Sequence, residues 1–205
     1  MKTQISIPCM DNVSALFTAS IVQLEKPDAK VVFQIGSLVG LAREELAKKA
    51  VVDGAEWMLF IDSDMTFPPY TLRYMLDVAE KNNLDFLTSV CYMRRQPYTP
   101  GLFKKFELLE DLSSNSEMYE EVPPKGLFEV EACGLACALV KTKVIMDVVE
   151  KFGFAFTMLG PTGEDLSFCW KARACGYKLY ADPALKIGHV SQFVVTRDTY
   201  EAMRK

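Results

Sequence analysis

The sequence is short of histidine, of positive charge and of long apolar runs, and each shortage excludes a class of protein. His189 is the only histidine, and the six cysteines contain no Cys-x-x-Cys pair, which argues against a zinc site built from these residue types. No run of about 18 apolar residues is present, so no membrane-spanning helix is predicted. Lysine and arginine number 23 against 27 aspartates and glutamates, so no basic face for nucleic acid is expected.

The remaining composition is that of one folded domain. Half of the 205 residues are hydrophobic and 24% are charged, which suits a single sizeable core. The apolar stretch after Lys2 resembles the start of a secretory signal, but Pro8, Asp11 and Asn12 interrupt it too early. We therefore expect a cytoplasmic protein whose cysteines are reduced and mostly buried.

The first third of the chain alternates short apolar strands with amphipathic helices. Residues 57–61 are five apolar residues in a row, as in a strand that is buried on both faces. Such a β-α-β-α-β series predicts an α/β fold with a mostly parallel sheet flanked by helices. The predicted strands are residues 4–9, 30–35 and 57–61, and the predicted helices are residues 14–26 and 38–52.

The rest of the chain is less regular. Pro68 and Pro69 precede a helix, since proline is favoured in a first turn. Residues 107–121 are acidic, polar and poorly periodic, which predicts a mobile surface loop, and Gly134 interrupts a stretch of strand. The predicted helices are residues 70–81, 142–151 and 163–174, and the predicted strands are residues 84–92, 128–140, 178–181 and 185–187.

Two carboxylates directly follow the third predicted strand. Ligands of open α/β sheets bind at the carboxyl ends of the strands, and Asp62 and Asp64 offer there the hard oxygens that Mg²⁺ or Mn²⁺ prefers. A metal at this place can bridge two phosphates and offset the charge on a departing diphosphate. Asp-Ser-Asp is also common turn chemistry, so a plain polar junction is the alternative.

Further candidates come later in the chain. Asp165 opens a predicted helix, where a rigidly held carboxylate suits a general base, although the helix dipole alone also favours a carboxylate there. His189 follows a short predicted strand, and its imidazole suits Mn²⁺ as a third ligand; a structural histidine is the alternative. Arg94 and Arg95 could bind phosphate in a bidentate manner or lie in a solvated loop.

Three segments resemble, in order, the motifs of GT-A glycosyltransferases. Phe60-Ile61-Asp62-Ser63-Asp64 resembles the DxD motif, Gly163-Glu164-Asp165-Leu166-Ser167-Phe168 the ED motif, and Lys186-Ile187-Gly188-His189 the metal-histidine motif. Family-2-like enzymes and the polypeptide N-acetylgalactosaminyltransferases share this layout. Similarity extends to Ile5-Ser6-Ile7-Pro8, to Leu41-Ala42-Arg43-Glu44 (with Glu44 in place of the usual Asn), to Gly134 with Leu139-Val140, and to Arg173 and Gly176.

The resemblance implies roles in metal binding and catalysis. Asp64 and His189 would ligate the metal, and Asp62 would contact the metal or the nucleotide ribose. Asp165, beside Glu164 in the catalytic motif, would be the base of an inverting enzyme. In a retaining enzyme Asp165 would instead contact the acceptor or the leaving-group side.

The resemblance also implies a nucleotide site. Pro8 and Arg43 would lie near the nucleotide, together with Asp62 and Ser63. The second strand of this fold often ends in an aspartate that contacts the base, and only Gln34 stands there in this chain. The identity of the nucleotide therefore stays open, with a UDP-sugar as the first expectation.

The implied activity is metal-dependent glycosyl transfer, of a hexosyltransferase-like kind. With Mn²⁺ or Mg²⁺, the enzyme would move a sugar from a nucleotide-diphosphate sugar to a hydroxyl of a glycan, protein or small-molecule acceptor. Residues 1–205 would form one GT-A domain, with the nucleotide-binding half in 1–66 and the acceptor side and metal-histidine segment in 84–205. The sugar, the acceptor and assembly into a homo-oligomer stay open.

Two other functions fit parts of the pattern. Asp62-Ser63-Asp64-Met65-Thr66 also matches the D-x-D-x-T motif of haloacid-dehalogenase-like phosphatases, in which the first aspartate is the nucleophile. That motif normally lies on the first strand, and it leaves His189 without a role. A non-catalytic domain that only holds a nucleotide sugar is the third reading, and the joint presence of Asp62, Asp64, Asp165 and His189 argues against it.

Overall fold

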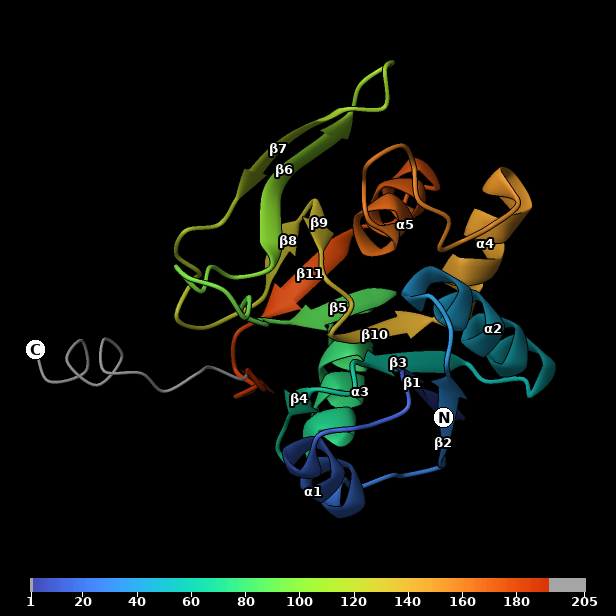
Figure 1. Ribbon diagram of the computed structural model, residues 1–205, viewed down its shortest axis with the longest axis vertical. Coiled ribbons are helices and arrows are strands. Elements are labelled where there is room, and N and C mark those ends of the chain that lie inside the picture. The colour runs from blue at the N-terminus through green and yellow to red at the C-terminus, as the bar shows by residue number, and fades with distance from the viewer. Residues whose placement is uncertain (1, 192–205) are drawn as a thin grey trace, which may run out of the picture.

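The computed structural model describes residues 2–191 and is built around a seven-stranded mixed sheet (Figure 1). Its strands are β1 Thr3–Cys9, β2 Ala29–Ile35, β3 Trp57–Ile61, β5 Phe86–Ser89, β8 Phe128–Val130, β10 Cys137–Lys141 and β11 Leu179–Asp182. They lie in the order β2-β1-β3-β10-β5-β11-β8. Only β10 and β8 run against the other strands, so the predicted α/β fold with a mostly parallel sheet is confirmed.

Helices cover both faces of this sheet, which explains why β3 is apolar at every position. Trp57, Leu59 and Ile61 pack into one core with α1 (Ala15–Gln23) and α3 (Thr71–Lys81). Met58 and Phe60 pack into a second core with α2 (Val39–Val52), α4 (Thr142–Phe152) and α5 (Glu164–Ala174). Successive side chains of a strand point to opposite faces, so a strand that is covered twice needs apolar residues throughout.

The first three strands bring their carboxyl ends to one edge of the sheet. β1 pairs in parallel with β2 on one side and with β3 on the other. The helix between β1 and β2 begins where predicted, because the Ser14 hydroxyl accepts the N–H groups of Leu16 at 3.2 Å and Phe17 at 3.5 Å. This parallel arrangement places the ends of β1, β2 and β3 side by side.

The antiparallel strand β10 completes that edge. It lies between β3 and β5, and its first residue, Cys137, pairs with Ile61 at the end of β3. Residues 134–136, just before β10, therefore lie beside the turn that follows β3. The N–H of Asp62 donates to the Ala136 carbonyl at 3.1 Å.

The structure corrects three local predictions. Residues 107–121 are not a surface loop, because β6 (Leu102–Leu108) and β7 (Ser114–Met118) form a hairpin there, with β9 (Ala132–Cys133) on the other side of β6. The strand predicted at 84–92 is only the four residues of β5. Residues 185–187 form no strand; the next two, β12 (Gly188–His189), pair with β4 (Met65–Thr66).

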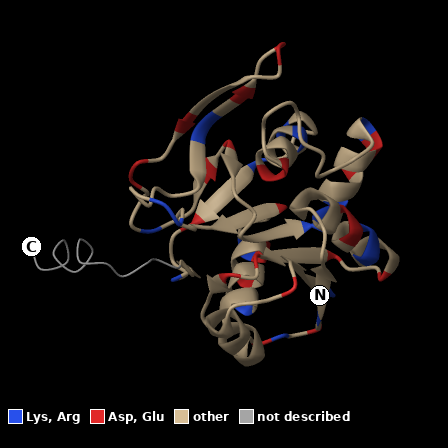
Figure 2. Ribbon diagram, in the orientation of Figure 1, with Lys and Arg blue, Asp and Glu red and all other residues tan. Residues whose placement is uncertain are grey.

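Residues of both charges occur on several elements of the fold (Figure 2). Figure 2 shows lysine and arginine spread over several elements and interspersed with aspartate and glutamate. All six cysteines are free, and four of them are buried: Cys9, Cys133, Cys137 and Cys169. Within residues 2–191, none of the helices combines the length and the apolar character that crossing a bilayer requires.

Candidate functional site

The acidic turn after β3 is joined to the end of the described chain by a two-stranded ribbon. The Asp62 carbonyl accepts the N–H of Met65 at 3.2 Å, which closes the turn. β12 pairs with β4 so that His189 lies opposite Met65, and the Val190 N–H donates to the Asp64 carbonyl at 2.8 Å. The ribbon thus brings the only histidine of the chain to the Asp-Ser-Asp turn.

His189 and Asp64 face one another through their side chains. The Nε2 atom of His189 lies 3.4 Å from Asp64 Oδ2, and its Nδ1 donates to the Tyr92 carbonyl at 2.9 Å. A carbonyl only accepts hydrogen bonds, so in the neutral ring the proton sits on Nδ1 and the lone pair of Nε2 faces Asp64. The Asp64 hydrogen bond raises the pKa of His189, against the effect of burial.

A guanidinium also lies against Asp64. Arg94 Nη1 is 2.9 Å from Asp64 Oδ2. Burial favours the neutral acid, but His189 and Arg94 outweigh it and the pKa of Asp64 is lowered. Asp64 is therefore an ionised carboxylate, and its Oδ2 atom contacts both the imidazole of His189 and the guanidinium of Arg94.

Arg43 on α2 holds the other aspartate of the turn. Its side chain is 3% exposed; Nη2 lies 2.8 Å from Asp62 Oδ1, and Nη1 pairs with Glu164 Oε1. Burial opposes the charge of Arg43, but the carboxylates of Asp62, Glu164 and Asp165 outweigh it, and its pKa is raised. One buried guanidinium thus joins the DxD-like turn to the start of α5.

Asp165 lies in the first turn of α5. Its Oδ1 atom accepts the N–H of Leu166 at 2.8 Å. Burial raises its pKa, against the attraction of Arg43. A Cβ at Gly163 would lie 2.9 Å from Asp165 Oδ1, closer than carbon and oxygen normally approach, so glycine leaves room for this carboxylate.

Two buried charges for which the sequence predicted no role support the loop before α5. Glu44 Oε1 accepts the N–H of Phe156 at 2.6 Å, so the residue that replaces the usual Asn holds this loop. Lys171 donates to three carbonyl oxygens of the same loop at 2.9–3.2 Å, those of Phe154, Ala155 and Thr157. The start of α5 is thereby fixed relative to α2.

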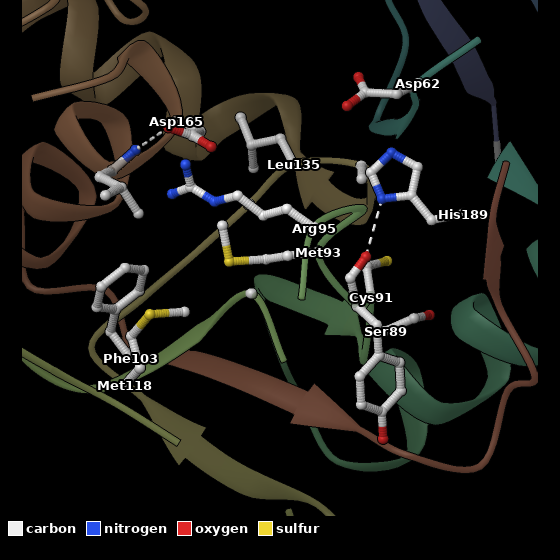
Figure 3. A pocket seen from close by; sticks show the side chains of 15 residues that line it. Asp62, Ser89, Cys91, Met93, Arg95, Phe103, Met118, Leu135, Asp165 and His189 are labelled. Carbon is white, nitrogen blue, oxygen red and sulfur yellow. Dashed lines mark hydrogen bonds between the residues drawn. The ribbon is translucent and has the colours of Figure 1, made fainter. Parts of the chain in front are cut away.

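Two cavities adjoin at Asp62. The first, of about 370 Å³, is lined by Asp62, Asp165 and His189 among others (Figure 3). The second, of about 390 Å³, lies at the carboxyl ends of β1 and β3 and is lined by Pro8, Cys9, Met10, Ser37, Leu38, Val39, Asp62, Ser63, Asp64 and Arg94. Ligands of α/β sheets bind at such strand ends.

Not every predicted site residue joins these cavities. Gln34 lines neither of them, and its side-chain oxygen accepts a hydrogen bond from Lys49 at 2.7 Å. Arg43 and Glu164 also line neither cavity; Arg43 forms ion pairs with both Asp62 and Glu164. In the part of the chain that is described, no three His, Cys, Asp or Glu side chains converge as a metal site by themselves.

The comparisons with known proteins concern the fold. No protein-family model matches the chain, and no curated protein sequence does. Solved structures do: A197 from STIV has a TM-score of 0.66 at 19% identity, over 95% of this chain and 87% of that one. GalNAc-T7, solved with UDP, GalNAc and Mn²⁺, has a TM-score of 0.61 at 10% identity over 95% of this chain, which spans only 44% of that protein. The chain has the GT-A fold that its motifs led us to expect.

Proposed function

We propose that the chain is a metal-dependent glycosyltransferase that moves a sugar from a nucleoside-diphosphate sugar to an acceptor hydroxyl. The observation that carries the proposal is the meeting of Asp62, Asp64, Asp165 and His189 around two adjoining cavities of a GT-A fold. Because the GalNAc-T7 structure contains UDP and Mn²⁺, these are the ligands to test first.

The side chains beside the acidic turn fit a divalent cation. Asp64 Oδ2 and His189 Nε2 face one another, and the Tyr92 carbonyl fixes the histidine ring through Nδ1, as outer partners commonly do for ligating histidines. Mg²⁺ and Mn²⁺ sites of this kind use one or two protein carboxylates and complete their shell with phosphate oxygens and water. Two protein ligands therefore suffice. The ion would neutralise charge on the departing diphosphate.

In this proposal Asp165 is the base. The acceptor hydroxyl attacks the anomeric carbon, the bond from that carbon to the diphosphate oxygen breaks with its electron pair, and Asp165 takes the hydroxyl proton. Arg43 keeps Asp62 and Glu164 in place beneath the donor. Arg94 lies beside Asp64 in the second cavity, where a guanidinium can bind the diphosphate. Attack opposite the leaving group inverts the anomeric configuration.

Calorimetric titration of UDP tests the donor site. We expect binding with Mn²⁺, loss of binding with EDTA, and loss in Asp64→Asn. Asp77→Asn, an exposed position on α3, is the matched control and should bind like the parent. Equal UDP affinity with Mn²⁺ and with EDTA would overturn the metal assignment.

Turnover separates the proposal from its alternatives. Incubation with UDP-sugars and Mn²⁺ should slowly release UDP through transfer to water. If the protein binds UDP but does not cleave UDP from the UDP-sugar, it is a binding domain. If it cleaves simple aryl phosphates, it is a phosphatase that uses Asp62.

A further inference from the structure

The first cavity has two chemically different ends. Asp62 and His189 lie at one end, and the side chains of Phe103 and Met118 lie at the other, with Arg95 between them in the view (Figure 3). Its volume of about 370 Å³ is near the lower limit of small-molecule sites, roughly 300–1,000 Å³. The cavity can hold one group about the size of a sugar, and the acceptor has to enter it to reach Asp165.

The end remote from Asp62 is apolar. Phe103 and Met118 are paired residues of the β6–β7 hairpin, and Met93 continues this wall from the segment after β5, whereas Leu135 lies beside Asp165 in the view (Figure 3). Thioethers accept hydrogen bonds only weakly, and a phenylalanine side chain offers none. A sugar carries a hydroxyl on nearly every carbon and would leave most of them unpaired against this wall, whereas an aliphatic or aromatic body would be matched.

Among the described residues that line this cavity, Arg95 is the one with a permanent positive charge. Its neighbour Arg94 is paired with Asp64, but the guanidinium of Arg95 forms no ion pair or hydrogen bond within residues 2–191 and remains exposed. The other ionised groups of the lining, Asp62 and Asp165, would repel an anion that entered the cavity. A free guanidinium offers a planar fork that matches a carboxylate or a phosphate, and it would offset this repulsion.

We propose that the first cavity binds an anionic amphiphile as the acceptor: a hydroxyl compound whose apolar body lies against Met93, Phe103 and Met118 and whose phosphate or carboxylate group pairs with Arg95. The inference rests on the proposed glycosyl transfer, for which it names the acceptor class. The ion pair between this anionic group and Arg95 would fix the orientation of the acceptor, so that the acceptor hydroxyl points toward Asp165.

Three probes separate charge from apolar contact: octyl phosphate, octyl glucoside and inorganic phosphate. Their binding is measured by ligand-observed NMR below the micelle concentration, with EDTA present so that no metal captures phosphate. We expect octyl phosphate to bind at least about tenfold more tightly than octyl glucoside, since a charge-assisted hydrogen bond contributes about that factor or more. We expect a similar margin over inorganic phosphate, since only octyl phosphate buries an alkyl chain against the apolar wall.

Variants locate the binding. Arg95→Gln should weaken octyl phosphate about tenfold or more, as expected for the loss of a charge-assisted pair. Met118→Gln should weaken octyl phosphate and leave inorganic phosphate unchanged. Arg73→Gln removes the same charge from an exposed site on α3, where Arg73 pairs with Glu25, and should change nothing.

The results distinguish this inference from the donor proposal. Equal binding of octyl phosphate to the parent and Arg95→Gln, or equal binding of octyl glucoside and octyl phosphate, overturns the inference, and UDP titration with Mn²⁺ shows whether the donor site still stands. Inorganic phosphate bound as tightly as octyl phosphate also overturns it, because a plain anion site needs no apolar wall. Arg95-dependent binding of octyl phosphate without any binding of UDP supports the anion contact and overturns the proposed donor.

Discussion

At the scale of single residues, Arg43 is the group on which both acidic motifs depend. Its guanidinium contacts Asp62 and Glu164, the latter 121 residues further along the chain. Arg43→Met keeps much of the side-chain length but leaves both carboxylates without their partner. Removing one partner of a buried ion pair destabilises by about 3–5 kcal/mol, and because Asp62 is partly exposed we expect about 3 kcal/mol. For a domain of this size that lowers Tm by roughly 6–12 °C, measured by circular dichroism.

A second variant checks the cause of this loss. Arg43→Met combined with Glu164→Gln removes one of the stranded carboxylates, so it should recover part of the lost stability. Non-additivity of this kind is expected for residues in one ion-pair network. A single Arg43→Met variant that melts with the parent would show that the pairing contributes nothing.

Asp165→Asn tests the assignment of the base. The amide keeps the shape of the side chain and can still accept the Leu166 N–H, but it cannot take a proton. Transfer should slow by about 10²-fold or more while UDP affinity is kept. Burial raises the pKa of Asp165, so in the parent the acidic limb of the rate profile should lie above the ordinary aspartate value of about 3.9. An unchanged rate in Asp165→Asn would reduce Asp165 to a helix-capping residue.

His189 should make metal binding sensitive to pH. Asp64 stabilises the protonated ring, so the pKa of His189 is raised, and a metal must displace the proton on Nε2. Mn²⁺ affinity should therefore weaken as the pH falls, starting above the ordinary histidine value of about 6.5. His189→Gln should bind Mn²⁺ weakly with little pH dependence in that range, as measured by calorimetry from pH 5 to 8. The same pH dependence in both proteins would exclude His189 as a ligand.

The sequence indicated the residues that the structure brings together better than it indicated the residues that support them. Asp62, Asp64, Asp165 and His189 could be selected because carboxylates and imidazole are recognisable by type and by place after a strand or at a helix start. The supporting roles of Glu44 and Lys171 could not be selected in this way, because their partners are backbone groups, which lie 112 residues from Glu44 and 14 residues from Lys171. Gln34 lines neither cavity, and its hydrogen bond with the Lys49 side chain on the next helix was not predicted from the sequence.

At the scale of elements, the β4–β12 ribbon determines where His189 lies, and Gly188 is the residue that permits it. A Cβ at position 188 would overlap the Thr66 hydroxyl on the partner strand. Gly188→Ala should therefore displace β12 and weaken Mn²⁺-dependent UDP binding. Because Thr66 Oγ1 is the obstacle, Gly188→Ala with Thr66→Ala should regain most of that binding, with Thr66→Ala alone as the control. Failure of the double variant to recover would place the defect elsewhere than in this contact.

Helices and strands could be predicted where the pattern of apolar and polar residues along the element itself reflects how the element is buried. β3 is apolar at all five positions because both of its faces are covered, and that run is visible in the sequence. β7 is exposed from Ser114 to Glu117, so nothing in its polarity distinguishes it from a loop; its pairing with β6 defines it. β12 has two residues and exists only through β4. Structure that depends on a distant partner leaves little trace in the local sequence.

At the scale of the whole molecule, the two cavities occupy the edge where parallel strands end and β10 begins. Asp62 belongs to both cavities, so a donor in the second can present its sugar to an acceptor in the first without crossing the sheet. The loop held by Glu44 and Lys171 ties α5, and with it Asp165, to α2. The distance between the proposed donor and the proposed base is thus set by the packing of α2 and α5.

Donor binding should therefore stabilise the whole domain. A ligand that binds only the folded state adds about 2.7 kcal/mol when its concentration is 100 times its Kd. For 205 residues this corresponds to a rise in Tm of roughly 5–11 °C with UDP and Mn²⁺ together, measured by differential scanning fluorimetry. UDP with EDTA should give almost no rise, because the diphosphate then meets Asp62 and Asp64 without a cation between them. Asp64→Asn should lose the rise, and Asp165→Asn should keep it, since Asp165 acts on the acceptor. A rise of equal size with EDTA would mean that the nucleotide binds away from the acidic turn.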